Sequence, residues 1–129
     1  MRKTTTVREY MSDLPEEVDR RDRLSTALAR MTELRLRHLP VMDGPKVYGL
    51  LSRHDALDAW VAHGARAGDL TVGEVCTRSP LTVSPVATIG EVAGQMVERG
   101  VTSALVTDGD MLVGIFTSVD ALRILAHAA

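Results

Sequence analysis

The stretch Gly49-Leu-Leu-Ser-Arg-His-Asp55 returns 65 residues later as Gly114-Ile-Phe-Thr-Ser-Val-Asp120. In each copy an apolar run that predicts a strand leads directly into a helix. The hydroxyl residue, Ser52 or Thr117, is suited to cap that helix. The aspartate falls at the third helical position, where a negative charge suits the helix dipole. One copy alone is therefore explained by helix capping, and the repetition carries the further information.

The repetition extends well beyond the motif. Aligning the sequence with itself at a shift of 65 residues gives 14 identities across residues 6–61 without a gap. Ordinary composition would give roughly 4. Similar pairs, such as Leu24 with Ile89, keep the same register. The chain is therefore predicted to hold two copies of one unit, repeats 1–64 and 65–129.

Each repeat is predicted to contain the same elements in the same order. A short helix, a brief extended piece, an amphipathic helix, a strand–turn–strand unit and a closing helix follow one another. In the first repeat we expect them at Val7–Met11, Glu17–Val18, 24–34, 39–51 and His54–His63. In the second repeat we expect them at Val72–Cys76, Leu81–Val83, from Ile89 to a stop at Gly100, 104–116 and Val119–His127. Residues 65–70 are expected to form a short link.

Composition excludes several function classes. The 129 residues include 15 Lys and Arg against 17 Asp and Glu, so a net charge of −2 gives no field that attracts nucleic acid or an anionic membrane. The arginines near residues 20–23 and 35–37 are interpreted as solvated faces. Aromatic residues make up 3% of the chain, too few for a base-stacking platform. We expect no nucleic-acid partner and, without an apolar run of about 18 residues, no membrane insertion.

The sequence also predicts a non-enzymatic, cytoplasmic protein. Cys76 is the only cysteine, which is typical of a reducing compartment. The four histidines are scattered, with no metal-binding spacing such as HExxH. Ser52, His54 and Asp55 lie within one helical turn and cannot align as nucleophile, base and orienting acid. We therefore expect no catalytic residue, no metal site and no required cofactor.

Together, these features resemble the CBS (cystathionine β-synthase) domain family. The resemblance rests on the repeated Gly-apolar-apolar-Ser/Thr-x-x-Asp motif, the 65-residue duplication, the strand start Leu39-Pro-Val41 and the segment Ser79-Pro-Leu-Thr-Val83. It covers both repeats. It implies an α/β fold of the α+β type, in which tandem β-α-β-β-α repeats pack sheet to sheet with pseudo-two-fold symmetry as a Bateman module.

The resemblance further implies that AMP, ADP, ATP, S-adenosylmethionine or a related ligand binds in clefts between the repeats. The motif aspartates would bond the ribose, the motif hydroxyls would lie near the phosphates, and the other repeat would supply the wall facing the adenine. The first implied cleft joins Ser52, Arg53 and Asp55 to Thr77, Pro80, Leu81, Thr102 and Ser103. The second joins Thr117, Ser118 and Asp120 to Ser12, Pro15, Glu16, Arg37 and His38. Arg37 and His38 are also expected to reach phosphate bound in the first cleft.

Of the two clefts, the one built on Asp55 is favoured. Leu81 offers an apolar side chain where the adenine would lie, whereas the matching position opposite Asp120 is Glu16. Burying an unpaired carboxylate beside a base costs several kcal/mol unless it protonates or accepts a hydrogen bond, for example from the adenine amino group. The sequence therefore predicts adenosyl binding on the Asp55 side.

Two function classes remain open. The first is a regulatory module that senses an adenine nucleotide, which the intact aspartate in both motifs favours. The second is a ligand-free module that mediates interaction or dimerisation with a separate partner protein. In either case the resemblance implies a homodimer formed through the helices after the two motifs, and a separate regulated protein.

Overall fold

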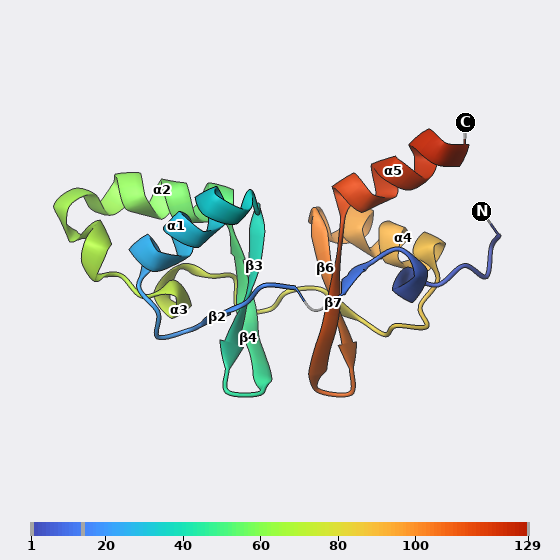
Figure 1. Cartoon of the computed structure of the whole chain (residues 1–129), viewed down its shortest axis with the longest axis horizontal. Coiled ribbons are helices and arrows are strands. Elements are labelled where there is room, and N and C mark those ends of the chain that lie inside the picture. Colours follow the sequence, from blue (N-terminus) through green and yellow to red (C-terminus); the bar gives the residue numbers. More distant parts are fainter. Residues whose placement is uncertain (1, 14, 129) are drawn as a thin grey trace. The chain divides into compact units, whose positions relative to one another are not determined.

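The computed structural model describes residues 2–13 and 15–128, and their contacts divide the chain into two compact units. The central unit is Glu16–Pro80, and the C-terminal unit joins Met1–Pro15 to Leu81–Ala129 (Figure 1). These units are offset from the sequence repeats 1–64 and 65–129. The N-terminal segment belongs with most of the second repeat, and residues 65–80 belong with the first.

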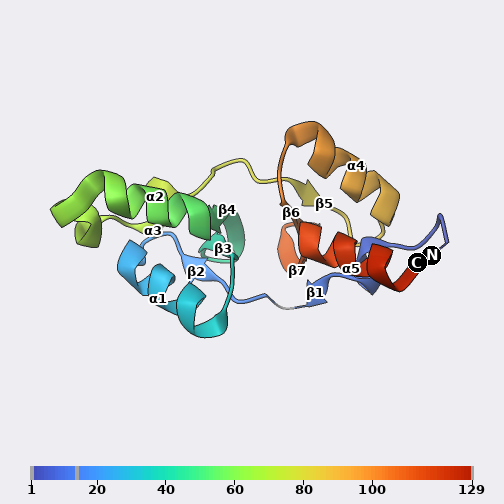
Figure 2. The same cartoon turned by 90° about the horizontal axis from the view of Figure 1, so that it is seen from above.

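The central unit contains a three-stranded sheet covered by helices (Figure 2). Its strand order is β2-β3-β4, with β2 and β3 parallel and β3 and β4 antiparallel. The elements are β2 (Val18–Asp19), α1 (Leu24–Leu34), β3 (His38–Asp43), β4 (Lys46–Ser52), α2 (Arg53–His63), the 3-10 helix η2 (Gly64–Asp69) and α3 (Val72–Val75). The core joins Leu24 and Met31 of α1 to Leu39 of β3, Leu51 of β4 and Ala56 of α2. Apolar residues spaced three or four apart therefore place α1 on the sheet.

The C-terminal unit contains a four-stranded sheet in the order β1-β7-β6-β5. Its elements are the 3-10 helix η1 (Val7–Glu9), β1 (Ser12–Asp13), β5 (Thr82–Val83), α4 (Ile89–Arg99), β6 (Ser103–Asp108), β7 (Met111–Thr117) and α5 (Ser118–Ala128). Phe116 and Val92 are fully buried in its core, next to Ile124 of α5. This unit therefore repeats the strand-and-helix layout of the central unit.

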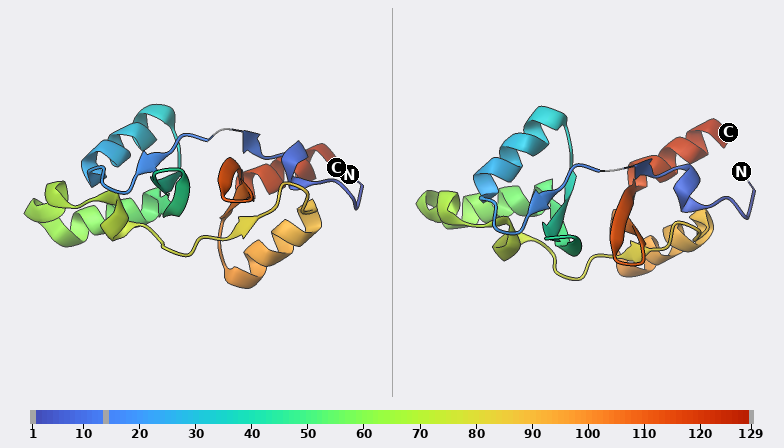
Figure 3. Two further views of the ribbon diagram at one scale, coloured as in Figure 1. Left: turned by 90° about the horizontal axis from the view of Figure 1, so that it is seen from below. Right: turned by 60° about the horizontal axis from the view of Figure 1, so that its bottom comes forward.

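The short lead-in helix of each repeat packs in the unit formed mainly by the other repeat. In the C-terminal unit, Ser12 of β1 pairs with Ile115 of β7. In Figure 3 the blue N-terminal segment runs beside the orange-red strand β7. In the central unit, Thr77 pairs with Leu50 of β4. A shift of 65 residues converts one pair into the other, so the two repeats exchange equivalent segments. Burial of the fully enclosed Val7 anchors one exchanged helix and stabilises it by about 1.5–3 kcal/mol.

The structure confirms most of the elements predicted from sequence. Both hairpins and all four long helices lie where expected to within one residue at each end, and Gly64 and Gly100 end α2 and α4. Glu9 accepts a hydrogen bond from the Thr6 backbone amide at 2.7 Å, which supports the predicted start of η1. The prediction of a plain link at 65–70 is wrong, because residues 64–69 form η2. The two-residue strand β1 was also not predicted.

The fold class is mixed α/β, with two sheets among the described residues, as the sequence predicts. The sheet-to-sheet packing of the repeats stays a prediction. No helix in the described ranges is long and apolar enough to cross a membrane.

Candidate functional site

The motif of the central unit caps α2 and leaves its aspartate exposed. The Ser52 hydroxyl accepts a hydrogen bond from the Asp55 backbone amide at 3.0 Å, as predicted for an N-cap residue. The Asp55 carboxylate is exposed and has no hydrogen bond or ion pair with any residue that the structure describes. This carboxylate is therefore an acceptor with both oxygens available.

Two basic residues lie next to this helix start. The Arg53 backbone amide donates to the Arg37 carbonyl at 2.8 Å, and His38 is paired with Ser52 across β3 and β4. The Arg37 side chain is exposed. Burial lowers the pKa of the His38 imidazole, and the charge of Arg37 lowers it further. His38 is therefore neutral at pH 7, and the positive charge at this helix start comes from Arg37 and Arg53.

The lead-in segment of the second repeat, which comprises residues 73–78, pairs with the same strand, β4. Thr77 and Leu50 exchange two backbone hydrogen bonds, each 2.9 Å long. This close pairing requires glycine at position 49, since a Cβ there would overlap the Thr77 carbonyl oxygen and lie 2.8 Å from Cys76 Sγ. The motif glycine therefore admits the exchanged segment. The central unit contains eight of the predicted site residues: Glu16, Arg37, His38, Ser52, Arg53, Asp55, Thr77 and Pro80.

The motif of the C-terminal unit has a different arrangement. The Asp120 carboxylate accepts hydrogen bonds from the Thr117 backbone amide at 2.8 Å and from the Thr117 hydroxyl at 3.1 Å. Its other oxygen lies 3.7 Å from Arg123 Nη1. Asp120 is only 9% exposed. Its carboxylate is therefore already engaged within its own helix start.

The neighbours of Asp120 match those of Asp55 in position. The Ser118 backbone amide donates to the Thr102 carbonyl at 2.9 Å, and the buried Ser103 pairs with Thr117. Thr102 and Ser103 thus lie beside the motif of their own repeat, as Arg37 and His38 do. The resemblance instead implies that each of these pairs faces the motif of the opposite repeat.

A single substitution between the repeats explains part of the difference between the two aspartates. Arg123 lies three residues after Asp120, but the equivalent residue after Asp55 is Asp58. Asp58 pairs with His54 at 3.2 Å instead. A residue three positions along a helix is close enough to form an ion pair. The sequence therefore contained this signal, although the analysis of the motif did not use it.

Two residues used to choose between the clefts have roles that the sequence did not reveal. Glu16 forms an ion pair with Arg30, which also donates to the Glu17 carbonyl at 2.6 Å, so the assumption of an unpaired carboxylate is wrong. Leu81 is 6% exposed and belongs to the hydrophobic core of the C-terminal unit. Its side chain is therefore committed to packing within its own unit.

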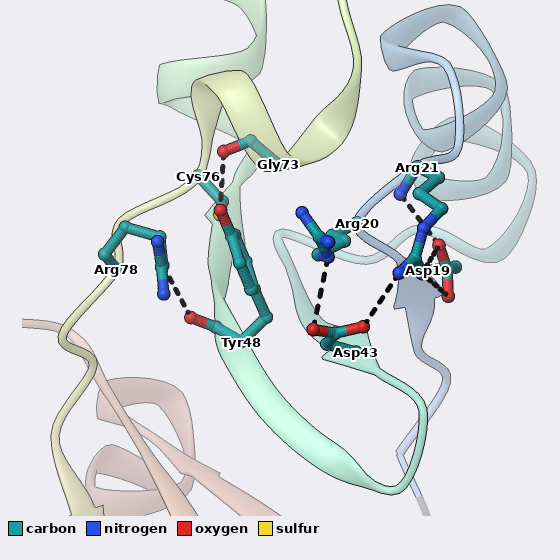
Figure 4. Close-up of polar contacts among 8 residues, drawn as sticks. All are labelled: Asp19, Arg20, Arg21, Asp43, Tyr48, Gly73, Cys76 and Arg78. Atoms are coloured by element: carbon teal, nitrogen blue, oxygen red, sulfur yellow. Dashed lines mark hydrogen bonds and ion pairs between the residues drawn. The ribbon is translucent and has the colours of Figure 1, made fainter.

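A polar cluster in the central unit was missed by the sequence analysis (Figure 4). The Tyr48 ring has the Arg78 guanidinium carbon 3.6 Å from its centroid and the Arg20 guanidinium carbon at 5.1 Å. Asp43 lies 3.3 Å from Arg20 and 3.1 Å from Arg21. Desolvation raises the pKa of Asp43, but hydrogen bonds and charges from the two arginines outweigh it and hold that pKa below its ordinary value. No sequence period connects these residues, so the pattern carried no signal.

The described residues contain no group of three or more His, Cys, Asp or Glu side chains arranged to hold a metal ion.

Solved structures with this arrangement of elements are numerous, and three illustrate the range. A Vibrio cholerae protein described as an acetoin utilization protein, AcuB, is 28% identical with a TM-score of 0.86, covering 97% of this chain and 93% of that one. The CBS domain pair of MJ0100, solved with 5′-methylthioadenosine and S-adenosyl-L-methionine, is 23% identical with a TM-score of 0.88, covering 98% and 99%. CBSX2, solved with AMP, is 23% identical with a TM-score of 0.83, covering 96% and 98%.

The family comparison agrees with the internal repeat. The CBS domain model matches the chain twice, at residues 7–62 and 72–127. Each match contains one copy of the Gly-apolar-apolar-Ser/Thr-x-x-Asp motif. The chain therefore belongs to the CBS domain family.

Proposed function

We propose that this chain is a non-enzymatic regulatory module that binds an adenine nucleotide or related adenosyl ligand through the Asp55 side of the central unit. The observation that carries the proposal is the exposed Asp55 carboxylate, which has no partner among the described residues. It stands at the start of α2, beside Arg37 and Arg53. A cytoplasmic location and a separate regulated protein belong to the same proposal.

The chemistry of this helix start suits a nucleotide. A carboxylate accepts hydrogen bonds from the two ribose hydroxyls, and such charge-assisted bonds are each worth about 1.5–3 kcal/mol. Phosphate suits the N-terminus of an 11-residue helix, where the backbone amides and the dipole favour negative charge. Arg37 and Arg53 add positive charge, which favours phosphate at this helix start. Relatives in the family that bind AMP, S-adenosyl-L-methionine or 5′-methylthioadenosine support this class of ligand.

The contacts of the second motif aspartate, Asp120, disfavour ligand binding on its side. Both oxygens of Asp120 have partners, so a ribose would have to displace the Thr117 and Arg123 contacts. Glu16 does not disfavour the Asp120 side, because its carboxylate is paired with Arg30. The preference for Asp55 therefore rests on the engagement of Asp120 itself. Thr117, Ser118, Thr102 and Ser103 would then serve mainly to build the second helix start.

We expect Asp55→Ala to weaken binding of the ligand tenfold or more, because it removes charged acceptors for the ribose. Isothermal titration calorimetry with AMP, ADP, ATP, S-adenosylmethionine and 5′-methylthioadenosine measures the effect. The matched control is Asp58→Ala, which removes a carboxylate from the same helix one turn further along. If none of these ligands binds to the wild-type chain, the alternative of a ligand-free interaction module replaces this proposal. Unchanged binding by Asp55→Ala would place the site elsewhere.

We also propose a homodimer formed through apolar surfaces on α1, α2 and α5. A groove of about 510 Å³ between α1 and α2 has Leu28, Leu57 and Trp60 among its lining residues. On α5, Leu122 and Leu125 are 62% and 66% exposed. Exposed apolar patches of this kind mark interaction surfaces. Ala56 of α2 and Ile124 of α5 are buried in the cores and do not contribute to this surface.

Sedimentation should therefore give about twice the 14.0 kDa mass of one chain. We expect Leu122→Glu to shift the protein toward monomer, because a charge in an apolar interface is costly to desolvate. His127→Glu, at an exposed position near the end of the same helix, is the control and should leave the mass unchanged. A wild-type monomer at tens of micromolar would contradict the dimer.

A further inference from the structure

The polar cluster of the central unit holds the lead-in segment through a contact between Arg78 and Tyr48 of β4. Arg78 stacks on the Tyr48 ring at 3.6 Å from the centroid, and its Nε donates to the Tyr48 carbonyl at 3.1 Å. Figure 4 shows the ring between the Arg78 and Arg20 guanidinium groups. Arg78 therefore contacts both the side chain and the backbone of Tyr48. The Tyr48 hydroxyl has no hydrogen bond to a described residue, so the ring face carries the contact.

These contacts fix the backbone of Thr77 from two sides. Immediately before Arg78, Thr77 exchanges its two hydrogen bonds with Leu50. Further back, the Gly73 backbone amide donates to the Arg20 carbonyl at 2.8 Å, and a Cβ at Gly73 would lie only 2.9 Å from that oxygen. The segment from Gly73 to Arg78 is thus held at both of its ends. Its position relative to Ser52, two residues beyond Leu50, is determined by these contacts.

The C-terminal unit lacks the residues that form the arginine–tyrosine stack. At the equivalent positions, 65 residues away, Arg78 is replaced by Asp13 and Tyr48 by Val113, while Arg20 is replaced by Pro85. The backbone pairing survives without them, since Ser12 still pairs with Ile115. The fold therefore does not require the stack. The stack occurs in the same unit as Asp55, the motif aspartate whose carboxylate has no partner among the described residues, which suggests a role in ligand binding by that unit.

We propose that Arg78 and Tyr48 are positioning residues for the ligand site of the central unit, holding Thr77 and Pro80 in place before an adenosyl ligand arrives. The proposal rests on the function proposed above. Ordering a loop on binding reduces affinity, so a segment that is already held binds more tightly. A stacked guanidinium at a partly exposed site, together with one hydrogen bond, supplies enough energy to change affinity about five- to tenfold.

The test measures affinity and local order in the same variants. We expect Arg78→Ala and Tyr48→Leu each to weaken adenosyl-ligand binding about five- to tenfold in calorimetry. Hydrogen exchange of the Thr77 amide should accelerate in both variants, while amides of α1 exchange as in the wild type. Tyr48→Phe keeps the ring face and should bind normally. Arg21→Ala removes an arginine that contacts Asp19 and Asp43 but not the lead-in segment, and it should also bind normally.

The outcomes separate this inference from the proposed function. If the wild type binds and both Arg78→Ala and Tyr48→Leu bind equally well, the positioning role is overturned and the proposed function stands. If Arg78→Ala weakens binding but Tyr48→Leu does not, Arg78 acts on the ligand directly and the positioning role is again overturned. If the wild type binds no adenosyl ligand, both the proposed function and this inference fail. Parallel losses in the two variants, with faster exchange confined to the lead-in segment, support it.

Discussion

Replacing Gly49 by alanine is expected to lower the free energy of unfolding by about 1–3 kcal/mol or more, as overpacking of a close contact does. A Cβ at this position would overlap the Thr77 carbonyl oxygen, which belongs to the backbone and cannot rotate away. The two hydrogen bonds between Thr77 and Leu50 would have to lengthen or break to make room. Urea denaturation followed by circular dichroism measures the change.

Two further glycine variants calibrate this result. Gly114→Ala should be milder, because the nearest atom to its Cβ is Sδ of the flexible Met11, although the Ser12 carbonyl oxygen lies at 2.9 Å. Gly94→Ala, in the exposed middle of α4 with nothing within 4 Å, should instead stabilise the protein by about 0.5–1 kcal/mol. If Gly49→Ala is as stable as the wild type, the lead-in segment does not pack on β4 as described.

We expect Asp120→Ala to reduce stability more than Asp55→Ala does, and Asp55→Ala to reduce ligand affinity more than Asp120→Ala does. Asp120→Ala is expected to cost about 1–3 kcal/mol, because it leaves the Thr117 backbone amide without its acceptor in a largely buried place. Asp55→Ala should cost less than about 1 kcal/mol, the value of a charge at a helix start, since its carboxylate has no described partner. Thermal or urea unfolding of the two variants without ligand provides the comparison.

An isosteric control separates the lost hydrogen bond from the lost charge. Asp120→Asn keeps one carbonyl oxygen that can accept from the Thr117 amide, so it should recover part of the stability. If Asp55→Ala is the more destabilising of the two alanine variants, the engagement of Asp120 is not what distinguishes the motifs. The preference for the Asp55 side would then lose its structural basis.

Local interactions explain why much of this fold could be predicted. The helix starts at Thr6, Ser52 and Thr88 depend on side chains three residues apart, and each is found where the sequence indicates it. The hairpins depend on adjacent apolar runs around a turn containing Gly44 or Gly109, both at positive φ. Because of the 65-residue repeat, each element predicted in one copy was also predicted at the equivalent position of the other. The helix η2 was not predicted because Gly64–Asp69 has neither a side-chain N-cap nor an apolar period.

The candidate site was predicted less completely, because its decisive features are contacts between distant residues. The motif identified Asp55 and Asp120 as a pair, but only their surroundings distinguish a free carboxylate from an engaged one. Glu16 was judged by its charge, yet its partner Arg30 lies 14 residues away. Leu81 was judged by its apolar side chain, which the core of its own unit takes up.

The sequence by itself determined the duplication, the elements of each repeat and the family, since these depend on spacing within a few residues or on a fixed offset. Only the tertiary structure decided that the repeats exchange their lead-in segments, with Ser12 on β7 and Thr77 on β4. It also decided that an Arg78–Tyr48 stack holds one of those segments. The physical reason is that a pairing between residues 27 or 103 positions apart, as for Leu50–Thr77 and Ser12–Ile115, leaves no periodic trace in the chain. It depends on where glycine lets two backbones meet.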